Sequence, residues 1–406
     1  MSGYGNVGAA IVGTGFMATA HTDALRRLGV QVRGIVGRTP ERGDMAARRL
    51  GLPRAYRSLA EVLEDRSVQA VHIVTPNSLH AQQVMQALEA GKHVICEKPL
   101  APSSEEASAL VDMSLHADTV TAVCLNVRYY PQCIHARDLI ARGRIGTVRM
   151  VTGRYHQDWL ARATDWNWRL EPDQQGRLRA VADIGVHWLD LVQTWLDDRI
   201  DSVFADLYTF LPKRRRPTTT MEAFRHVRDE EVGGVEVDVH SDDAAALLAR
   251  FRNGARAVAT FSQVSYGNKN CIEVQVDGSE SSLTWRSEEP EYLWLGHRGQ
   301  PNELVTKDYD LLSDLATKKA RYPVGHVEGY PDTFVSLFGD VYDDILRGGR
   351  SAQPRYPTFT DGYDLVLICE AIEESARVGR WVPVRRSDET RTADSSVSQF
   401  NSFRNR

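Results

Sequence analysis

The hydrophobic positions in the first 125 residues or so form short apolar runs separated by helical repeats. The apolar runs predict buried strands at residues 8–13, 30–37, 68–76, 93–99 and 119–127. The segments between them have helical periodicity, at residues 14–29, 40–51, 80–91 and 103–117, with Gly29 ending the first helix and Pro40 opening the second. Strands that alternate with helices predict βαβ units, in which right-handed crossovers join the strands of one parallel sheet.

The pattern changes after about residue 146, where longer strands alternate between apolar and polar positions. Two hairpins are predicted, one turning at Asn253-Gly254 and the other at Asp277-Gly278. A further strand is expected within 145–159, and helices at 184–196, 331–347 and 361–378 are expected to cover one face. This half is therefore predicted to be a mostly antiparallel sheet. The polar tail at 386–406 is predicted to be disordered.

With 406 residues, the chain is long enough for two domains, or for one domain with a large insertion. Its net charge of −5 leaves no basic surplus, so we expect neither nucleic acid nor an anionic membrane as a partner. We expect no membrane span, since no apolar run approaches ~18 residues, and no secretory signal. The five cysteines include no CxxC pair, which indicates reduced thiols, a cytoplasmic location and no metal site.

Residues 13–18 read Gly-Thr-Gly-Phe-Met-Ala, a GxGxxA pattern that follows the first predicted strand and opens the first helix. The first glycine allows a tight turn, the second lets the backbone approach a pyrophosphate, and the alanine permits close helix–strand packing. The helix N-terminus adds N–H groups and a positive dipole end. The pattern therefore favours a dinucleotide site over a plain glycine-rich turn, with phosphate contacts from Gly13, Thr14, Gly15, Phe16 and Met17.

The end of the second strand bears on the choice of dinucleotide. An acidic residue there accepts from the ribose 2′-OH in NAD sites, but this chain has Gly37, Arg38 and Thr39. Arg38 can pair with a 2′-phosphate and Thr39 can donate to it. We therefore expect NADP, with NAD as the alternative, since Arg38 stacked on the adenine would suit either cofactor.

Two further motifs end later strands: Thr75-Pro76-Asn77 followed by His80, and Glu97-Lys98-Pro99. With the GxGxxA pattern, "NVRYYP" at 126–131, "DIGVHWLD" at 183–190 and the segment 356–382, they resemble the glucose–fructose oxidoreductase / inositol dehydrogenase / MocA-type (Gfo/Idh/MocA) oxidoreductase family. The resemblance covers nearly the whole chain. Segments 153–169 and 325–334 are similar to a sugar or glycoside dehydrogenase subgroup.

The resemblance implies an α/β protein with an N-terminal Rossmann domain at 1–128 and a C-terminal α+β domain at 129–385, which binds substrate and whose large open sheet joins a homodimer or homotetramer. It implies hydride transfer between nicotinamide and a hydroxyl or ketone of a sugar, glycoside or cyclitol. It also implies cofactor contacts from both strand-end motifs, namely Thr75, Pro76, Asn77, His80, Glu97 and Lys98.

Three residues fit the chemistry of hydride transfer from an alcohol. Lys98, at the end of a parallel strand, can hydrogen-bond the reacting hydroxyl and stabilise developing negative charge. His187 is the natural base, with Asp183 four residues earlier on the same helical face. The structural alternative is that Asp183 caps the helix and that His187 is a core histidine whose hydrogen bonds are all made within the protein. Together with Lys98 and the GxGxxA pattern, the pair favours catalysis. Sequence does not give the isomer of the bond before Pro99, which is a candidate for cis.

Other candidates are less specific. Asn126 and Arg128 follow the last strand of the first half and suit cofactor or substrate contacts, although Arg128 as an ion-pair partner is nearly as plausible. Asp158, Trp159 and Trp168 suit a wall for sugar hydroxyls and C–H faces, with loop packing as the even alternative.

A second substrate loop is suggested by His326 and Glu328, of which His326 is the candidate contact. The basic run "KRRR" at 213–216 is expected to be a solvated hairpin tip. The functional alternative is that this basic run binds a phosphorylated or nucleotide-linked substrate.

The leading hypothesis is an NAD(P)-dependent dehydrogenase acting on CH–OH groups. Within enzymes, the alternative is a ketoreductase of a nucleotide-linked sugar. From another class, a dinucleotide-binding regulatory protein would keep the fold without turnover, but it has no need of a base.

Overall fold

The computed structural model describes residues 3–218 and 233–385 of the chain. Its first part is a six-stranded parallel sheet in the order β3-β2-β1-β4-β5-β6. The strands are β1 (Gly8–Val12), β2 (Gln31–Val36), β3 (Ala55–Tyr56), β4 (Ala70–Ile73), β5 (His93–Cys96) and β6 (Thr121–Val123). The intervening helices are α1 (Phe16–Leu28), α2 (Pro40–Leu50), α3 (Leu59–Glu64), α4 (His80–Glu89) and α5 (Ser104–His116). Short 3-10 turns lie at η1 (Gly3–Asn6), η2 (Asn77–Leu79) and η3 (Asn126–Tyr129). The predicted βαβ arrangement is confirmed.

Local signals explain where these helices begin and end. Gly29 adopts a left-handed conformation, with φ of 86°, and its N–H bonds to the last turn of α1. Thr39 and Ser103 cap α2 and α5 by accepting from backbone N–H groups three residues on. Of these signals, the sequence analysis used only Gly29, and the caps at Thr39 and Ser103 are additions from the structure.

The second part is a nine-stranded sheet in the order β16-β15-β14-β13-β7-β12-β11-β8-β17. All neighbouring strands are antiparallel except β7 and β12. The strands are β7 (Met150–His156), β8 (Ile200–Tyr208), β11 (Ala244–Phe251), β12 (Arg256–Ser262), β13 (Cys271–Asp277), β14 (Ser282–Arg286), β15 (Tyr292–Gly296), β16 (Glu303–Thr306) and β17 (Val382–Pro383). The two predicted hairpins correspond to β11–β12 and β13–β14.

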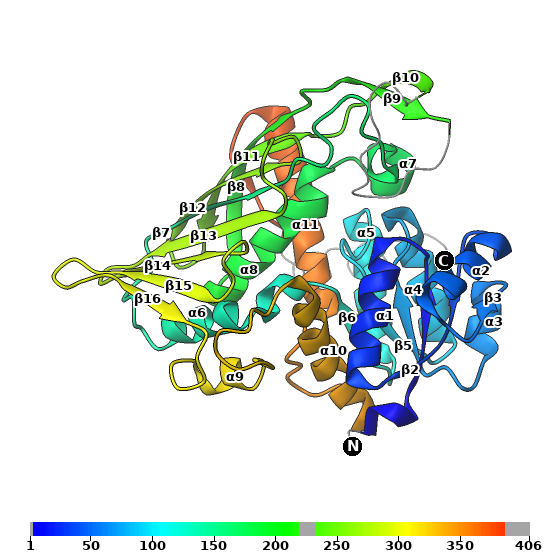
Figure 1. Cartoon of the computed structure of the whole chain (residues 1–406). Coiled ribbons are helices and arrows are strands. Elements are labelled where there is room, and N and C mark those ends of the chain that lie inside the picture. The colour runs from blue at the N-terminus through cyan, green and yellow to red at the C-terminus, as the bar shows by residue number, and fades with distance from the viewer. Residues whose placement is uncertain (1–2, 219–232, 386–406) are drawn as a thin grey trace, which may run out of the picture.

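Helices fill the space between the two sheets (Figure 1). They are α6 (Pro131–Ala141), α8 (Val186–Leu196), α10 (Tyr330–Leu346) and α11 (Phe359–Val378). The remaining short elements are α7 (Pro172–Gln175), α9 (Asp314–Thr317), η4 (Trp168–Leu170) and the π-helical turn η5 (Val181–Gly185), of which α9 lies at the outer edge beside β16. Helix α11 contacts β8 of the large sheet and α5 of the first part, and α10 packs on α1. One hydrophobic cluster therefore includes residues from both sheets, such as Val94 and Val203.

The basic run at 213–216 is not the solvated tip that the sequence suggested. It forms β9 (Lys213–Pro217), paired with β10 (Gly234–Asp238) in a two-stranded ribbon. Arg214 is fully buried, and it donates to Asp243 at 2.6 Å and to the carbonyl of Leu160 at 2.9 Å. The prediction was wrong for Arg214, because one face of the ribbon packs against the loop after β7. The tip between these strands and the tail at 386–406 lie outside the described residues.

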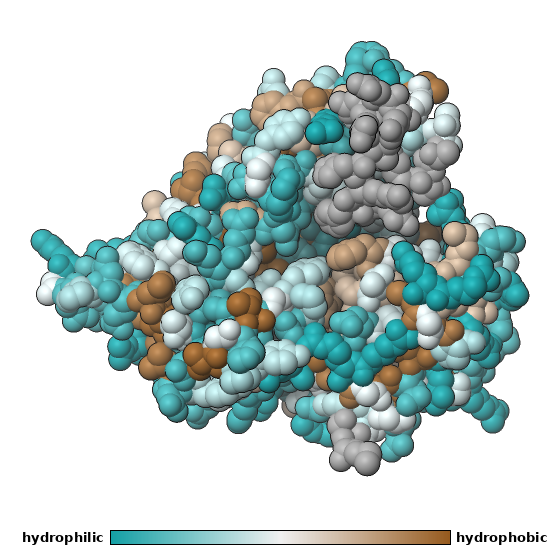
Figure 2. Space-filling model, in the orientation of Figure 1, coloured by the Kyte–Doolittle hydropathy of each residue, from teal (hydrophilic) through white to brown (hydrophobic). Residues whose placement is uncertain are grey.

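Two other differences concern strand length and surface. The expected strand at 119–127 is only three residues long, because after β6 the chain turns into η3. Figure 2 shows a face on which hydrophilic residues predominate, with hydrophobic ones in scattered groups. Within the described ranges, no helix is both long and apolar enough to cross a membrane.

Candidate active site

The motifs found along the sequence meet at one edge of the first sheet. Neighbouring strands β1, β4 and β5 are parallel, so their carboxyl ends lie together. The loop at 13–15 follows β1, Thr75-Pro76-Asn77 follows β4, and Glu97-Lys98 follows β5. Ligands of open α/β sheets bind at this edge. The bond between Lys98 and Pro99 is cis.

The two glycines of the first loop have different roles in the structure. Gly13 has a φ of 117°, and a Cβ there would lie 2.7 Å from the carbonyl oxygen of Val74. The fold itself therefore requires a glycine at 13. At Gly15, by contrast, a Cβ would have no heavy atom within 4 Å. Gly15 precedes α1, so this open space lies at the helix N-terminus, where a dinucleotide pyrophosphate would bind.

The rest of this loop suits the same ligand. Phe16 is 47% exposed, and Met17 is half-buried with its sulfur 4.0 Å from the hydroxyl of Tyr330. The carbonyl of Thr14 accepts from Arg49 at 3.0 Å. The residues present therefore fit a nicotinamide dinucleotide at the N-terminus of α1.

At the end of β2, Arg38 is exposed and forms no ion pair within the described ranges. Thr39 has a different task from the predicted one: its oxygen accepts from the N–H of Arg42 at 3.4 Å, and it is hydrogen-bonded to Glu41. Hydrogen bonds from its own backbone and from Thr39 lower the pKa of Glu41. Arg38 is therefore the available cation at this position, and Glu41 is an acid that the sequence analysis did not weigh.

His80 joins the second and third motifs. One ring nitrogen lies 2.8 Å from the carbonyl oxygen of Pro99 and the other 2.9 Å from that of Thr75. Burial lowers the pKa of His80. Asn77 is buried as well, and its amide donates to the carbonyl of Gln175 at 3.0 Å. In the structure His80 therefore connects the turn after β4 to the turn after β5, and Asn77 connects the turn after β4 to α7.

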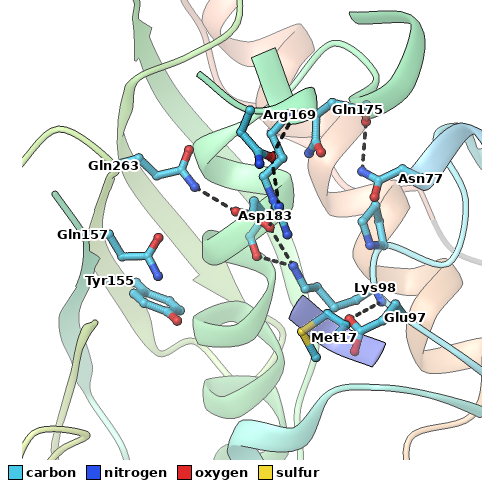
Figure 3. Close-up of polar contacts among 12 residues, drawn as sticks. Met17, Asn77, Glu97, Lys98, Tyr155, Gln157, Arg169, Gln175, Asp183 and Gln263 are labelled. Carbon is cyan, nitrogen blue, oxygen red and sulfur yellow. Dashed lines mark hydrogen bonds and ion pairs between the residues drawn. The ribbon is translucent and has the colours of Figure 1, made fainter. Parts of the chain in front are cut away.

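Lys98 and Asp183 form the centre of the site (Figure 3). The Lys98 ammonium lies 2.9 Å from the Asp183 carboxylate and 2.7 Å from the Asp183 backbone carbonyl. The same carboxylate forms an ion pair with Arg169 at 2.9 Å and accepts from Gln263 at 2.8 Å. Donors from three separate segments therefore converge on one buried acid, an arrangement that orients Lys98.

The charges in the site fix the protonation states. Burial would raise the pKa of Asp183, but the cations Arg169 and Lys98 outweigh it and hold this pKa well below its ordinary value. For His187, burial and the Lys98 ammonium both act against the charged form and lower its pKa to about 3. Asp183 is thus a carboxylate and His187 a neutral imidazole at neutral pH.

His187 is placed to take a proton. It is 7% exposed, and neither ring nitrogen has a hydrogen-bond partner within the described ranges. Nδ1 is fully buried, which leaves Nε2 as the nitrogen that a ligand can reach. Asp183 lies in the π-helical turn η5 and His187 in the first turn of α8, so one continuous helical segment presents both. Asp183 therefore does not cap the helix, and His187 is not a satisfied core histidine.

Sequence reasoning missed Arg169, Gln263 and Tyr155. Arg169 follows the tryptophan-rich loop, and its guanidinium also lies 4.6 Å from the ring centroid of Trp168. Gln263 follows β12, and the ring of Tyr155 on β7 has its centroid 6.3 Å from that of His187. In the linear sequence these residues look like ordinary polar positions at strand and loop ends.

The tryptophan loop is mostly packed. Trp159 is 6% exposed in a small hydrophobic cluster, and its N–H donates to Gln157 at 2.8 Å. Asp158 accepts from Lys269 at 2.6 Å and from the N–H of Gly267 at 3.0 Å. These contacts agree with the loop-packing alternative, whereas Trp168 is only half-buried and lies beside Arg169.

Three remaining candidates are engaged elsewhere. Arg128 forms a bidentate pair with Asp190, which is the ion-pair alternative. Asn126 is buried and donates to Thr333 at 2.7 Å. His326 is exposed, and its ring contacts the carbonyl of Val324 at 3.3 Å.

Glu328, which the sequence placed beside His326 in a second substrate loop, is 1% exposed and pairs with buried Lys307 at 2.7 Å. The structure thus gives Glu328 a structural role.

Comparison with known proteins adds independent information. The family profile described as "Oxidoreductase family, NAD-binding Rossmann fold" matches residues 7–124, and that of the "GFO/IDH/MocA C-terminal domain" matches residues 133–284. Levoglucosan dehydrogenase of Pseudarthrobacter phenanthrenivorans is 31% identical over 391 residues, which are 93% of this chain and 98% of that protein. Inositol 2-dehydrogenase 3 of Saccharopolyspora erythraea is 25% identical over 382 residues, 93% of this chain and 95% of its own.

Solved structures agree with these relatives. A levoglucosan dehydrogenase in complex with NADH and levoglucosan superposes with a TM-score of 0.82 at 29% identity, covering 94% of this chain and 100% of the other. An oxidoreductase domain protein from Kribbella flavida gives 0.83 at 32% identity, with the same coverage.

Proposed function

Because this chain belongs to the Gfo/Idh/MocA oxidoreductase family and is an NAD(P)-dependent dehydrogenase of sugar or cyclitol hydroxyls, we propose that Lys98, Asp183 and His187 carry out its chemistry. The observation that carries the proposal is the contact of Lys98 with both the carboxylate and the backbone carbonyl of Asp183, with His187 neutral on the same helical segment.

Each residue has a distinct role in the proposal. A bound nicotinamide dinucleotide supplies the hydride acceptor. His187 accepts the proton of the substrate hydroxyl at Nε2, because its Nδ1 atom is buried. Lys98 donates a hydrogen bond to the same oxygen and stabilises its developing negative charge. Asp183, held by Arg169 and Gln263, keeps Lys98 in place.

For the cofactor, we propose NADP in preference to NAD. The support is Arg38, an exposed cation without an ion pair in the described residues, together with the absence of an acid at 37–39. Glu41, and the similar structures that contain NADH, favour NAD instead. The cofactor choice is therefore tested separately from the chemistry.

For the substrate, we propose an anhydro sugar or glycoside. The support is the levoglucosan dehydrogenase relative, which matches this chain over nearly its whole length. Trp168, half-buried beside Arg169, is suited to contact the apolar face of a sugar ring.

We also propose a homo-oligomer joined through the open face of the large sheet. This face exposes apolar side chains at alternate strand positions, including Met150, Leu248, Val258 and Trp294, each at least 36% exposed. Light scattering of a Leu248→Lys variant tests this. A cytosolic location is proposed as well, and the five free cysteines support it.

The experiment on function follows reduced nicotinamide by absorbance, with both cofactors and a panel of anhydro sugars, glycosides, cyclitols and nucleotide-linked sugars. We expect turnover with one of the first three classes. Turnover only with the nucleotide-linked sugars would instead indicate a ketoreductase, and binding of dinucleotide without any turnover would indicate a regulatory protein.

Lys98→Met tests the mechanism. Loss of an electrostatic donor to the reacting oxygen lowers kcat by about 10³-fold, while cofactor binding persists. Lys92→Met is the matched control, because Lys92 is also buried and donates to backbone carbonyls, of Asp65 and Val68, away from the site. The control should keep its kcat, and a Lys98→Met enzyme with comparable kcat would refute the assigned role.

A further inference from the structure

A row of hydrogen-bonded, buried side chains runs from α10 into the core beside the first sheet and ends at Glu97. The hydroxyl of Tyr342 lies 2.9 Å from Nε2 of His72, and Nδ1 of His72 lies 2.9 Å from Nδ1 of His21. Nε2 of His21 lies 3.1 Å from the Glu97 carboxylate. The two histidines and Tyr342 are fully buried, so water does not complete their hydrogen bonds.

The hydrogen bonds in this row of side chains all point from Tyr342 toward Glu97. Within the described residues, the hydroxyl of Tyr342 bonds only to His72, so it donates its proton there. His72 must then carry its own proton on Nδ1 and donate it to Nδ1 of His21. His21 in turn carries its proton on Nε2 and donates to Glu97, which accepts as a carboxylate. In this arrangement each proton has an acceptor.

Other protonation states fit less well. If His21 were doubly protonated, His72 would donate to Tyr342, and the phenol proton would face no acceptor among the described residues. If the direction were fully reversed, Glu97 would have to be protonated. Burial would raise the pKa of Glu97, but the hydrogen bond from His21 and the charge of Lys98 act in the opposite direction and lower it. That hydrogen bond is present when His21 is neutral.

A metal site is the other reading of this region, since His21, Glu97 and Cys124 lie close together. Burial raises the pKa of the Cys124 thiol well above its ordinary value, so a metal there would have to offset the cost of deprotonating a buried thiol. The hydrogen bond from His21 to Glu97 explains why these residues lie close together, without an ion.

This row of hydrogen-bonded side chains ends next to the catalytic lysine, Lys98. Glu97 precedes Lys98, and its second oxygen accepts from the Lys98 backbone N–H at 3.2 Å. The charged or titratable groups nearest to Glu97 are His21, Lys98 and Cys124. Its charge also acts on Cys96, His80, His187 and Tyr330. The rings of Phe338 and Tyr342 on α10 pack against His72, at centroid distances of 4.8 and 6.0 Å.

We propose that Tyr342, His72 and His21 form a one-way donor relay that keeps Glu97 ionised and oriented beside Lys98, which makes them positioning residues for the reaction. The inference rests on the proposed function for its catalytic consequence only. Through the relay, a hydroxyl on α10 sets the charge next to the lysine that polarises the substrate.

The direct test is ¹⁵N NMR of histidine-labelled protein, which distinguishes the two neutral tautomers and the imidazolium. The full-length protein should show His72 protonated on Nδ1 and His21 on Nε2, with resonances assigned by their loss in His72→Leu and His21→Leu. Finding His72 protonated on Nε2, or His21 doubly protonated, at neutral pH would overturn the relay. This readout does not need turnover, so it stands even if the proposed substrate class fails.

The kinetic test uses Tyr342→Phe, which removes only the hydroxyl. We expect the His72 tautomer to shift toward Nε2–H, the acid limb of the kcat profile to move to higher pH, and kcat to fall by about tenfold. The matched control is Tyr356→Phe, because that buried hydroxyl bonds to Asp344 outside the relay. If Tyr342→Phe keeps the tautomers and the pH profile of the control, the hydroxyl has only a structural role.

Discussion

Gly15→Ala separates what the fold needs from what the cofactor needs. The backbone at Gly15, with φ of −76° and ψ of −166°, is open to any residue. A Cβ there meets no heavy atom of the protein within 4 Å. The added methyl group therefore enters only the space at the N-terminus of α1, where the pyrophosphate would bind.

The expected magnitudes follow from these facts. Reduced freedom of the unfolded chain stabilises the variant by about 0.4–1 kcal/mol. Alanine is a poorer N-cap than glycine by a similar amount, about 0.5–1 kcal/mol. The free energy of unfolding should hence stay within about 1 kcal/mol of wild type. Losing one charge-assisted hydrogen bond to phosphate, worth about 1.5–3 kcal/mol, weakens cofactor binding by about 10- to 100-fold.

The assay combines denaturant unfolding with titration of reduced nicotinamide fluorescence. Gly13→Ala is the contrasting variant, since its Cβ would lie 2.7 Å from a backbone oxygen and should destabilise the fold itself. Gly299→Ala, on an open loop with no heavy atom within 4 Å of its Cβ, controls for the substitution. An unchanged cofactor Kd in Gly15→Ala, with normal stability, would refute the assignment of this space to the pyrophosphate.

Three further predictions test the cofactor, the fold and the pH response. Arg38→Ala should weaken NADP binding far more than NAD binding in parallel titrations, and equal losses would contradict the cofactor proposal. Arg214→Leu leaves buried Asp243 with one cation fewer and should lower the free energy of unfolding by about 3–5 kcal/mol, whereas exposed Arg298→Leu should change it by less than about 0.5 kcal/mol. In the folded protein His187 has a pKa of about 3, below its ordinary value. As the pH falls below about 6.5, this histidine is protonated in the unfolded chain but not in the folded one, so the free energy of unfolding decreases between about pH 6.5 and pH 3. Unfolding measured at pH 7 and 4.5 should show a smaller loss for His187→Gln than for wild type, by up to about 2.7 kcal/mol; a steeper loss in the variant would contradict the burial of a neutral imidazole.

Most of the fold followed from features that are local in the chain. Alternating strand and helix patterns gave the parallel sheet, and the Asn-Gly and Asp-Gly turns gave the hairpins. The loop at 13–15 and the motif at Lys98 were found for the same reason. Each is contiguous and follows a strand, and parallel strands present their carboxyl ends at one edge.

The tertiary structure decided which side chains act together. Arg169 and Gln263 reach Asp183 from a loop and a strand end that the linear pattern does not connect. The basic run at 213–216 looked solvated because four cations in a row carry no sign of an inner face, yet the ribbon buries Arg214 against Asp243. Hydrophobic periodicity reports which face of an element is apolar, but the partner of a buried charge depends on which surfaces meet when distant segments pack.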